Sequence, residues 1–385
     1  MNQGFKAGNT DAPLTSSSLT MTENTNVMKI DAGGCGGYIN QPCVSVKICV
    51  PGTNNCQTIN RLLLDTGSYG LRVFKSVVNL NLPDVTDTSQ KTYAECIEYL
   101  DGSAQWGPVK KADVVLGGLK ASQVSIQIVD STYATVPTNC GESSNSLDIS
   151  PEEEGFNGIL GVGLFSEDCG AGCANSATNG LYFSCSGMSC TGATIPISKQ
   201  VTNPVSMLPS DNNGVIVDLP AISSNGTTQV FGSLILGIDT RENNRSSSLT
   251  FFQADNYGEM LTTFNGKTTY AFIDSGSNAL FFSPTTTIPV CTNSGLTSFF
   301  CPTTFTNQTA TLMGAAGTPS RQINFQVASA VTIFDNSNPN WIFNNLAGEY
   351  NDGFDWGLPF FFGRKVGFGI DNKTSNLGQG PYFAF

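Results

Sequence analysis

The sequence predicts an all-β protein with only a few short helices, and two observations carry that prediction. Charged residues make up only 12% of the 385 residues while 41 are glycine, a balance that favours strands joined by many turns. One string, Asp-(Thr/Ser)-Gly-Ser, also occurs twice, at Asp65 and again at Asp274, each time after an apolar run. The repeat predicts two similar lobes that divide near residue 205.

Strand-like segments can be followed in order through both halves. Some alternate apolar and polar side chains, and others are short apolar runs bounded by glycine. The expected strands are 44–50, 61–64, 112–116, 124–129, 215–219, 233–238 and 363–370. An apolar run broken by glycine also follows each motif, at 159–161 in the first half and at 357–361 in the second.

These segments divide the chain into three parts. Residues 1–27 are polar and are expected to form a flexible arm. Residues 28–205 are expected to form an N-terminal lobe that holds the first Asp and most cysteines, and residues 206–385 a C-terminal lobe that holds the second Asp. Within the first lobe, the acidic stretch 140–155 is expected to be a solvated loop, and 166–203 a loop region laced with disulfides.

Composition narrows the compartment and the partners. The net charge is −12 and only 18 residues are Lys or Arg, so the clustered cations that bind nucleic acid are not expected. No apolar stretch approaches the roughly 20 residues of a membrane-spanning helix, and residues 1–27 show no apolar signal region. We therefore expect a mature, trimmed chain that is secreted, periplasmic or at the cell surface. A monomer without a cofactor is expected.

The 12 cysteines favour disulfides over metal binding. Zinc sites commonly combine Cys with His, and the chain contains no His; an all-Cys zinc site among the four cysteines at 169–190 is the less favoured alternative. An oxidising compartment accounts better for an even, high cysteine count. Cys291 and Cys301 are the only cysteines after residue 190 and are expected to pair, while the four at 35–56 are expected to include local bridges.

The repeated motif places one carboxylate after an apolar run and before a glycine turn in each half. If Asp65 and Asp274 meet in the fold, they cannot both ionise easily, and the pair can hold one proton and a water. One carboxylate would then take a proton from the water, while the other donates to the carbonyl oxygen under attack. Either tripeptide alone is usually an ordinary turn, so the prediction depends on the two copies.

Three residues after each Asp have expected supporting roles. The glycine permits a tight turn and brings backbone N–H groups to the carboxylate. The Thr or Ser before it is expected to cross-link the two loops, and the Ser after it to hydrogen-bond the outer carboxylate oxygen. These supporting residues are Thr66, Gly67 and Ser68 in the first loop and Ser275, Gly276 and Ser277 in the second.

With these motifs the sequence resembles the pepsin-like aspartic peptidases of the A1 type. The likeness extends to the strings at 157–161, 232–239 and 357–368, and in order and spacing it covers most of the chain. The resemblance implies a bilobal, pepsin-like double β-barrel with a cleft between pseudo-symmetric lobes. It also implies that an extended peptide is the substrate and that hydrolysis is favoured at acid pH.

The resemblance also places a flap and reveals a departure from the family. Residues 97–103 resemble the family's flap, with Tyr99 over the two carboxylates as a hydrogen-bond donor; the alternative is a half-buried strand tyrosine. Arg72 stands where the family usually has a Trp that supports the flap tyrosine. The string Asp-Thr-Gly-Ser-Tyr-Gly-Leu-Arg, with residues 106–109 after the flap, is closest to an uncharacterised bacterial branch of the fold.

Two other functions compete with an aspartic endopeptidase. The first is a catalytically inert pepsin-like protein that acts as a binding or inhibitor protein at the cell surface; Arg72 and the altered flap favour it, while the survival of both Asp-x-Gly strings argues against it. The second is a glycosidase with two carboxylates, which the symmetric Asp-x-Gly pair disfavours.

Overall fold

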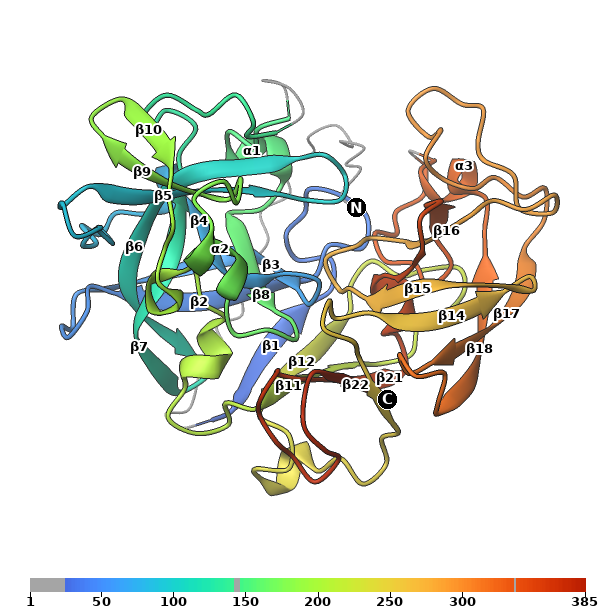
Figure 1. The fold of residues 1–385 in the computed structure, drawn as a ribbon. Coiled ribbons are helices and arrows are strands. Elements are labelled where there is room, and N and C mark those ends of the chain that lie inside the picture. The colour runs from blue at the N-terminus through green and yellow to red at the C-terminus, as the bar shows by residue number, and fades with distance from the viewer. Residues whose placement is uncertain (1–24, 142–145, 336) are drawn as a thin grey trace.

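The computed structural model describes residues 25–141, 146–335 and 337–385, whose regular secondary structure is mainly β (Figure 1). The α-helices of the described chain are only four or five residues long, as the sequence predicts. They are α1 (Pro151–Glu154), α2 (Ala171–Asn175) and α3 (Ala330–Ile333). The 3₁₀ turns are η1 (Lys75–Val77), η2 (Ile197–Lys199), η3 (Pro204–Met207), η4 (Glu242–Asn244) and η5 (Leu358–Phe360).

The strands fall into a first group, a second group and a set that joins them. The first group is β2 (Cys43–Cys49), β3 (Cys56–Asp65), β4 (Tyr69–Phe74), β5 (Thr92–Glu98), β6 (Ala104–Leu116), β7 (Leu119–Val129), β8 (Gly158–Val162), β9 (Tyr182–Ser186) and β10 (Ser189–Gly192). The second group is β14 (Met260–Phe264), β15 (Lys267–Ile273), β16 (Leu280–Phe282), β17 (Thr306–Met313), β18 (Ser320–Val327), β19 (Ala347–Glu349) and β20 (Phe354–Trp356). The joining strands are β1 (Val27–Asp31), β11 (Gly214–Leu219), β12 (Phe231–Leu236), β13 (Phe251–Gln253), β21 (Arg364–Gly369) and β22 (Tyr382–Ala384).

The two groups lie on opposite sides of the molecule, with the joining strands below and between them (Figure 1). The first group continues through β2 and β1 into β12, β11, β21, β22 and β13, in one sheet. Strand β1 makes the connection, because it pairs antiparallel with β12 and, at Asp31, with Cys43 of β2. The second group forms a separate sheet in the order β18-β17-β14-β15-β20-β16-β19.

The same strand arrangement surrounds each Asp. In the first half β8 lies between β3, to which it is parallel, and β4, to which it is antiparallel, and this register sets Asp65 opposite Gly161. In the second half β20 lies between the parallel β15 and the antiparallel β16. Gly161 in β8 and Gly357 directly after β20 have no room for a side chain. An added Cβ would lie 2.6 Å from the Tyr69 amide nitrogen at Gly161 and 2.0 Å from the Ala279 carbonyl oxygen at Gly357. The repeated motif therefore reflects a repeated backbone frame.

Burial explains the residue types of these strands. The alternating pattern of β2 matches its alternating burial, since one face packs into the core and the other faces solvent. The apolar run before Asp65 is buried throughout, as is β8, because neighbouring strands and the core cover both. These buried runs hold the first active-site loop on a rigid base.

All 12 cysteines are paired in six disulfides. The predicted Cys291–Cys301 bridge is confirmed, as are local bridges near the start of the chain. The cysteines at 169–190 also form two local disulfides, so they do not form the alternative zinc site. The pairs are Cys35–Cys43, Cys49–Cys56, Cys96–Cys140, Cys169–Cys173, Cys185–Cys190 and Cys291–Cys301.

The stretch 140–155 differs from the solvated loop that its acidic composition predicts. Its described residues include the short helix α1, capped by the Ser150 side chain, which accepts a hydrogen bond from the Glu153 amide. Asp148 is only 4% exposed. Composition misled the prediction here because burial of a single carboxyl depends on neighbours from other strands.

The predicted arm and the predicted division between the lobes can be compared with the described residues. Residues 1–24 of the expected arm lie outside the described residues, and β1 begins at Val27. The division near residue 205 falls in η3 and stays a prediction. No helix in the described ranges is both long enough and apolar enough to cross a membrane.

Candidate active site

The fold brings Asp65 and Asp274 together. Asp65 ends β3 and Asp274 directly follows β15, and the two are 6% and 8% exposed. The Gly67 amide donates to Oδ1 of Asp65 at 2.8 Å and to Oδ1 of Asp274 at 3.1 Å. Because one N–H contacts both inner oxygens, the two carboxyl groups face each other across that amide.

The serines of the two motifs bind the outer oxygens, as expected. The Ser68 hydroxyl donates to Oδ2 of Asp65 at 2.5 Å, and the Ser277 hydroxyl donates to Oδ2 of Asp274 at 2.8 Å. The Gly276 amide adds a 2.7 Å hydrogen bond to Oδ1 of Asp274. Each carboxyl group is therefore held in one orientation by donors from its own loop.

Thr66 and Ser275 cross-link the loops beneath the carboxyl pair. The Thr66 hydroxyl donates to the Ile273 carbonyl at 3.3 Å and accepts from the Ser275 amide at 2.9 Å. The Ser275 hydroxyl donates to the Leu64 carbonyl at 2.7 Å. These buried bonds join the strand ends of both halves, so the separation of the two acids is set by backbone rather than by flexible side chains.

Glycine is required at the third position of each motif because the opposing carboxyl group occupies the space of a side chain. A Cβ on Gly67 would lie 2.7 Å from Cγ of Asp274, and a Cβ on Gly276 would lie 2.9 Å from Cγ of Asp65. Neither glycine needs an unusual backbone angle, so close approach is the reason.

The pKa of Asp65 is higher than that of an isolated Asp. Burial, the charge of Asp274 and a hydrogen bond with Asp274 together raise the pKa of Asp65 to about 8. The Ser68 hydroxyl and the Gly67 amide oppose the rise. A buried pair of this kind titrates as one unit that keeps a proton at neutral pH.

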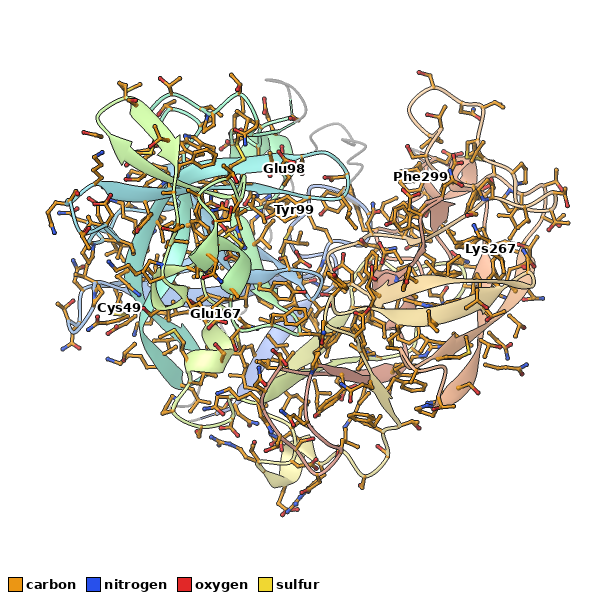
Figure 2. All side chains as sticks on the ribbon, in the orientation of Figure 1. Cys49, Glu98, Tyr99, Glu167, Lys267 and Phe299 are labelled. Atoms are coloured by element: carbon orange, nitrogen blue, oxygen red, sulfur yellow. A yellow bond between two sulfur atoms is a disulfide. The ribbon has the colours of Figure 1, made fainter. Side chains whose placement is uncertain are left out.

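The β5–β6 hairpin carries Tyr99 over the site. At its tip the Tyr99 amide donates to the Ser103 carbonyl and the Tyr99 carbonyl accepts from the Gly102 amide, both at 2.9 Å. Tyr99 lies near the middle of the molecule in Figure 2, and Tyr99 and Ser103 face the same cavity. Both residues line one cavity together with Asp65 and Asp274. Tyr99 is half-buried, and burial raises the pKa of its hydroxyl above the ordinary range.

Arg72 does not support Tyr99 as the family's Trp does. The Tyr99 hydroxyl donates instead to Oε1 of Gln105 at 3.2 Å, and the Gln105 amide donates to Oδ2 of Asp148 at 2.8 Å. Gln105 and Asp148 are both buried. The flap tyrosine is therefore held by a residue of its own hairpin and a buried carboxyl group.

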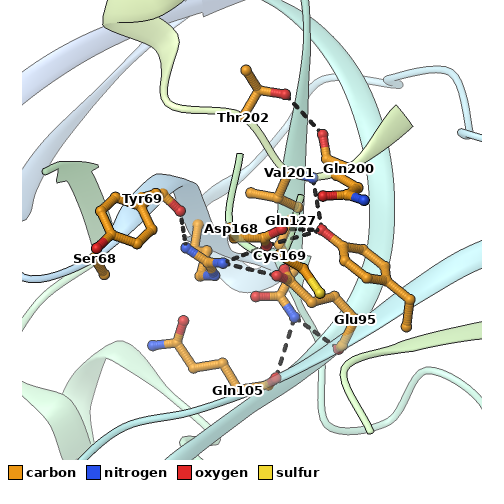
Figure 3. Close-up of polar contacts among 12 residues, drawn as sticks. Ser68, Tyr69, Glu95, Gln105, Gln127, Asp168, Cys169, Gln200, Val201 and Thr202 are labelled. Carbon is orange, nitrogen blue, oxygen red and sulfur yellow. Dashed lines mark hydrogen bonds and ion pairs between the residues drawn. The ribbon is translucent and has the colours of Figure 1, made fainter. Parts of the chain in front are cut away.

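Arg72 contacts two acidic side chains instead, and Figure 3 labels both of them, Glu95 and Asp168. Arg72 and Glu95 are 0% exposed, and the Asp168 side chain is 2% exposed. The Arg72 guanidinium group lies 2.8 Å from Glu95 and 3.0 Å from Asp168, and donates to the Tyr69 carbonyl at 2.7 Å. The Tyr182 hydroxyl donates to Asp168. Burial and the Glu95 carboxyl group raise the pKa of Asp168 well above its usual range, and the Arg72 guanidinium opposes that rise. The network ties the first active-site loop to β5 of the flap hairpin.

The cavity also contains residues that the sequence analysis missed. Beyond Asp65 and Asp274, hereafter the dyad, and the flap, the cavity is lined by apolar side chains and by three more carboxyl groups. These are the carboxyl groups of Asp101, Asp148 and Glu154. Burial and the charge of Glu154 raise the pKa of Asp148 to about 8. Asp355 is buried behind the second loop, and its signal in the sequence is a charged residue inside an apolar run. The described residues contain no group of three or more Cys, Asp or Glu that could hold a metal ion.

Comparisons with known proteins agree with this fold. The model of a family described as "Protein of unknown function (DUF3443)" matches residues 20–385. The chain belongs to this family. A solved structure of an aspartic proteinase from Irpex lacteus is similar, with a TM-score of 0.51 and 13% sequence identity over 93% of this chain and 96% of that chain. No curated protein sequence matches the chain.

The predicted fold class is thereby confirmed: the chain has a mainly β, pepsin-like fold with barrel-like sheets and short helices. At 13% sequence identity, the similarity to the Irpex lacteus structure shows the fold of this chain but not its activity. The expected likeness to a bacterial branch stays a prediction.

Proposed function

We propose that the chain is an aspartic endopeptidase that hydrolyses peptide bonds with a water activated by Asp65 and Asp274. The observation that carries the proposal is that both inner carboxyl oxygens accept from the same Gly67 amide. Such closeness leaves one proton on the pair, and that proton serves the chemistry. A cavity that the flap covers lies directly against the pair.

In this mechanism the pair acts as one acid–base unit. The ionised carboxyl takes a proton from a bound water while the protonated carboxyl donates to the carbonyl oxygen of the peptide. Ser68 and Ser277 keep the outer oxygens occupied, so the inner oxygens face the substrate. Tyr99 would donate to the substrate from the flap by releasing the hydrogen bond that its hydroxyl donates to Gln105.

The pKa of Asp65 sets the upper pH limit of activity. The active form holds one proton, so activity should rise as the first proton leaves the pair at acid pH and fall as the last one leaves near pH 8. Activity is thus favoured on the acid side of pH 8.

The remaining proposals concern substrate and location. The substrate is an extended peptide bound in the cleft by a monomer. Six disulfides fit an oxidising compartment, so we place the protein outside the cytoplasm, secreted, periplasmic or at the cell surface.

The test is cleavage of a mixed peptide library between pH 3 and 8 by the wild type and by Asp65→Asn and Asp274→Asn. The wild type should cleave, and each variant should lose at least about 1,000-fold, because the acid–base pair is the whole catalytic apparatus. A statine-type transition-state mimic should bind only the wild type.

An inert binding protein is the second candidate, and it is favoured by Arg72 in place of the supporting Trp. If the wild type binds peptides without cleaving them at any of these pH values, this second function replaces the first.

A further inference from the structure

A third carboxyl group, that of Asp355, is buried behind the second active-site loop. Asp355 is the central residue of β20, where it lies opposite Phe272 of β15 and opposite Phe281 of β16. Phe272 comes two residues before Asp274 and lines the active-site cavity. Position 355 therefore lies in the group of three strands, β15, β20 and β16, that surrounds Asp274.

The fold itself does not require an acid here, as the first half shows. The equivalent strand β8 places Ile159 opposite Leu63 of β3 and opposite Arg72 of β4. Ile159 is an ordinary apolar side chain in the same frame position. An acid at 355 therefore needs an explanation beyond folding.

Asp355 is completely buried, and neither of its carboxyl oxygens has a hydrogen-bond partner of good geometry among the described residues. An uncompensated buried carboxylate is costly, so the group takes its neutral form. Burial and the charges of Asp274 and Asp65 raise its pKa well above the ordinary range, and the Ser277 hydroxyl opposes that rise. Tyr350 is the other titratable described residue that feels its charge.

Ser277 links the strand of this acid to the dyad, since its carbonyl oxygen accepts from the amide of Leu358, two residues after β20, at 2.7 Å. Its hydroxyl donates to Oδ2 of Asp274 at 2.8 Å, which uses its proton and leaves its oxygen able to accept. A protonated Asp355 is a donor that suits this oxygen. No equivalent donor exists behind Ser68, because Ile159 occupies that place.

We propose that Asp355 is a positioning residue of the active site: its neutral carboxyl donates to the Ser277 hydroxyl, which fixes that hydroxyl as a donor to Asp274. The chain Asp355–Ser277–Asp274 favours the charge on Asp274 and makes the two halves of the dyad unequal. This role rests on the proposed endopeptidase function, but the hydrogen-bond chain can be measured without activity.

Two substitutions separate the neutral donor from mere packing. Asp355→Asn keeps a neutral group whose amide can donate, whereas Asp355→Ile copies the first half and removes the donor. Asp352→Asn, at an exposed acid three residues earlier, is the matched control. Because Asp355→Ile could unfold the site, Ser277→Ala breaks the same chain at its other member.

The experiment follows the carboxyl-carbon NMR signals of Asp65, Asp274 and Asp355 in the full chain from pH 3 to 9. Asp355 should stay protonated through neutral pH. Asp355→Asn should leave the titration of the dyad unchanged, as should Asp352→Asn. Asp355→Ile and Ser277→Ala should each raise the pH at which the dyad loses its last proton by roughly one unit, the equivalent of one hydrogen bond.

Two outcomes would overturn the proposal. If Asp355→Asn lowers the pH at which the dyad loses its last proton, Asp355 is charged in the native protein. If Asp355→Ile leaves that pH unchanged, Asp355 and the dyad are not coupled. A parallel measurement of the affinity for a statine-type mimic should show about tenfold weaker binding for Asp355→Ile and normal binding for Asp355→Asn. If the wild type binds no mimic, the proposed function fails while the NMR titration still decides the role of Asp355.

Discussion

The two halves of the active site share one frame but differ in what lies behind it. In the first half the residues paired across the inserted strand are Arg72 and Ile159; in the second half they are Phe281 and Asp355. Each pair thus contains one ionisable and one apolar side chain. The ionisable residue lies in the outer strand β4 in the first half and in the inserted strand β20 in the second half. The motifs that hold the carboxyl groups are alike because each must leave room for the opposing carboxyl group and hold its own, while the residues behind them differ with each half's own core.

The neighbours of Arg72 and Phe281 explain why the ionisable residue lies in different strands in the two halves. Arg72 faces Glu95 and Asp168, so a cation is needed there, whereas Phe281 packs in an apolar cluster and contacts the Phe299 ring at 6.2 Å between centroids. The first half therefore stabilises its loop with an ionic network, and the second half with aromatic packing. Substitutions in each half should show this difference.

The largest effect is expected from Arg72→Met. The change leaves Glu95 and Asp168 buried without their cation, which should lower the free energy of unfolding by about 3–5 kcal/mol at pH 7. The loss should shrink at pH 4, because a buried carboxyl group that takes up a proton no longer carries an uncompensated charge. Denaturant unfolding at both pH values measures this, and Arg245→Met, in an exposed pair with Glu242, is the control with a change below about 0.5 kcal/mol. An equal loss at both pH values would show that packing, not charge, is what Arg72 provides.

The next effect should be equal in the two halves. Gly67→Ala and Gly276→Ala each push a Cβ against the opposing carboxyl group, and a shift of that group should lower kcat/KM by about 100-fold. Gly172→Ala is the control, because its Cβ would meet only the Cys169 sulfur at 3.6 Å. If only one of the two active-site variants loses activity, the loops are not equivalent supports of the dyad.

A smaller effect concerns the wall of the cavity in the first half. The pKa of Asp148 is raised to about 8, so the folded protein keeps a proton there that the unfolded chain loses near pH 4. Stability should therefore fall as pH rises between about 4 and 8, and Asp148→Asn should remove the part of that fall that Asp148 contributes, while Asp65 keeps its own part. At pH 8 the variant should be more stable than the wild type by at least about 1.4 kcal/mol, the equivalent of one pKa unit, and no more stable at pH 3.

Denaturant unfolding of Asp148→Asn beside Glu152→Gln, an exposed neighbour, measures this difference. A wild type whose stability does not change with pH relative to Asp148→Asn would contradict a protonated Asp148.

The smallest effect is expected at the flap, which only the first half contributes. Tyr99→Phe removes the hydrogen bond to Gln105, worth about 1 kcal/mol, and should lower kcat/KM for peptides about fivefold. Tyr257→Phe, at a tyrosine that is 82% exposed, is the control. Unchanged kinetics for Tyr99→Phe would mean that the hydroxyl does not position the flap.

The sequence was sufficient for the parts of the site that are local. Asp65, Asp274 and their following Gly and Ser residues are contiguous, and the chemistry of a shared proton demands those residue types. Tyr99 is expected from the resemblance of residues 97–103 to the flap of the pepsin-like peptidases. The fold class followed from composition and repetition, since glycine-rich turns and short strands are distributed along the whole chain.

The layer behind the dyad was missed because its partners come from distant segments. Arg72 was interpreted as a substitute for a flap-supporting Trp, but its partners Glu95 and Asp168 are fixed only once β4 and β5 pack. Gln105 and Asp355 gain their importance from burial, which strand pattern alone does not give. A charged residue within an apolar run was the signal that could have pointed to Asp355.

The central claim is that Asp65 and Asp274 share one proton, and the titration of Asp65 tests it most directly. Carboxyl-carbon NMR should give Asp65 a pKa of about 8 in the wild type. In Asp274→Asn the neighbouring charge is gone, so the pKa should fall toward the value that burial alone sustains. An Asp65 that titrates near 4 in the wild type, or whose pKa does not change in Asp274→Asn, would contradict the shared proton.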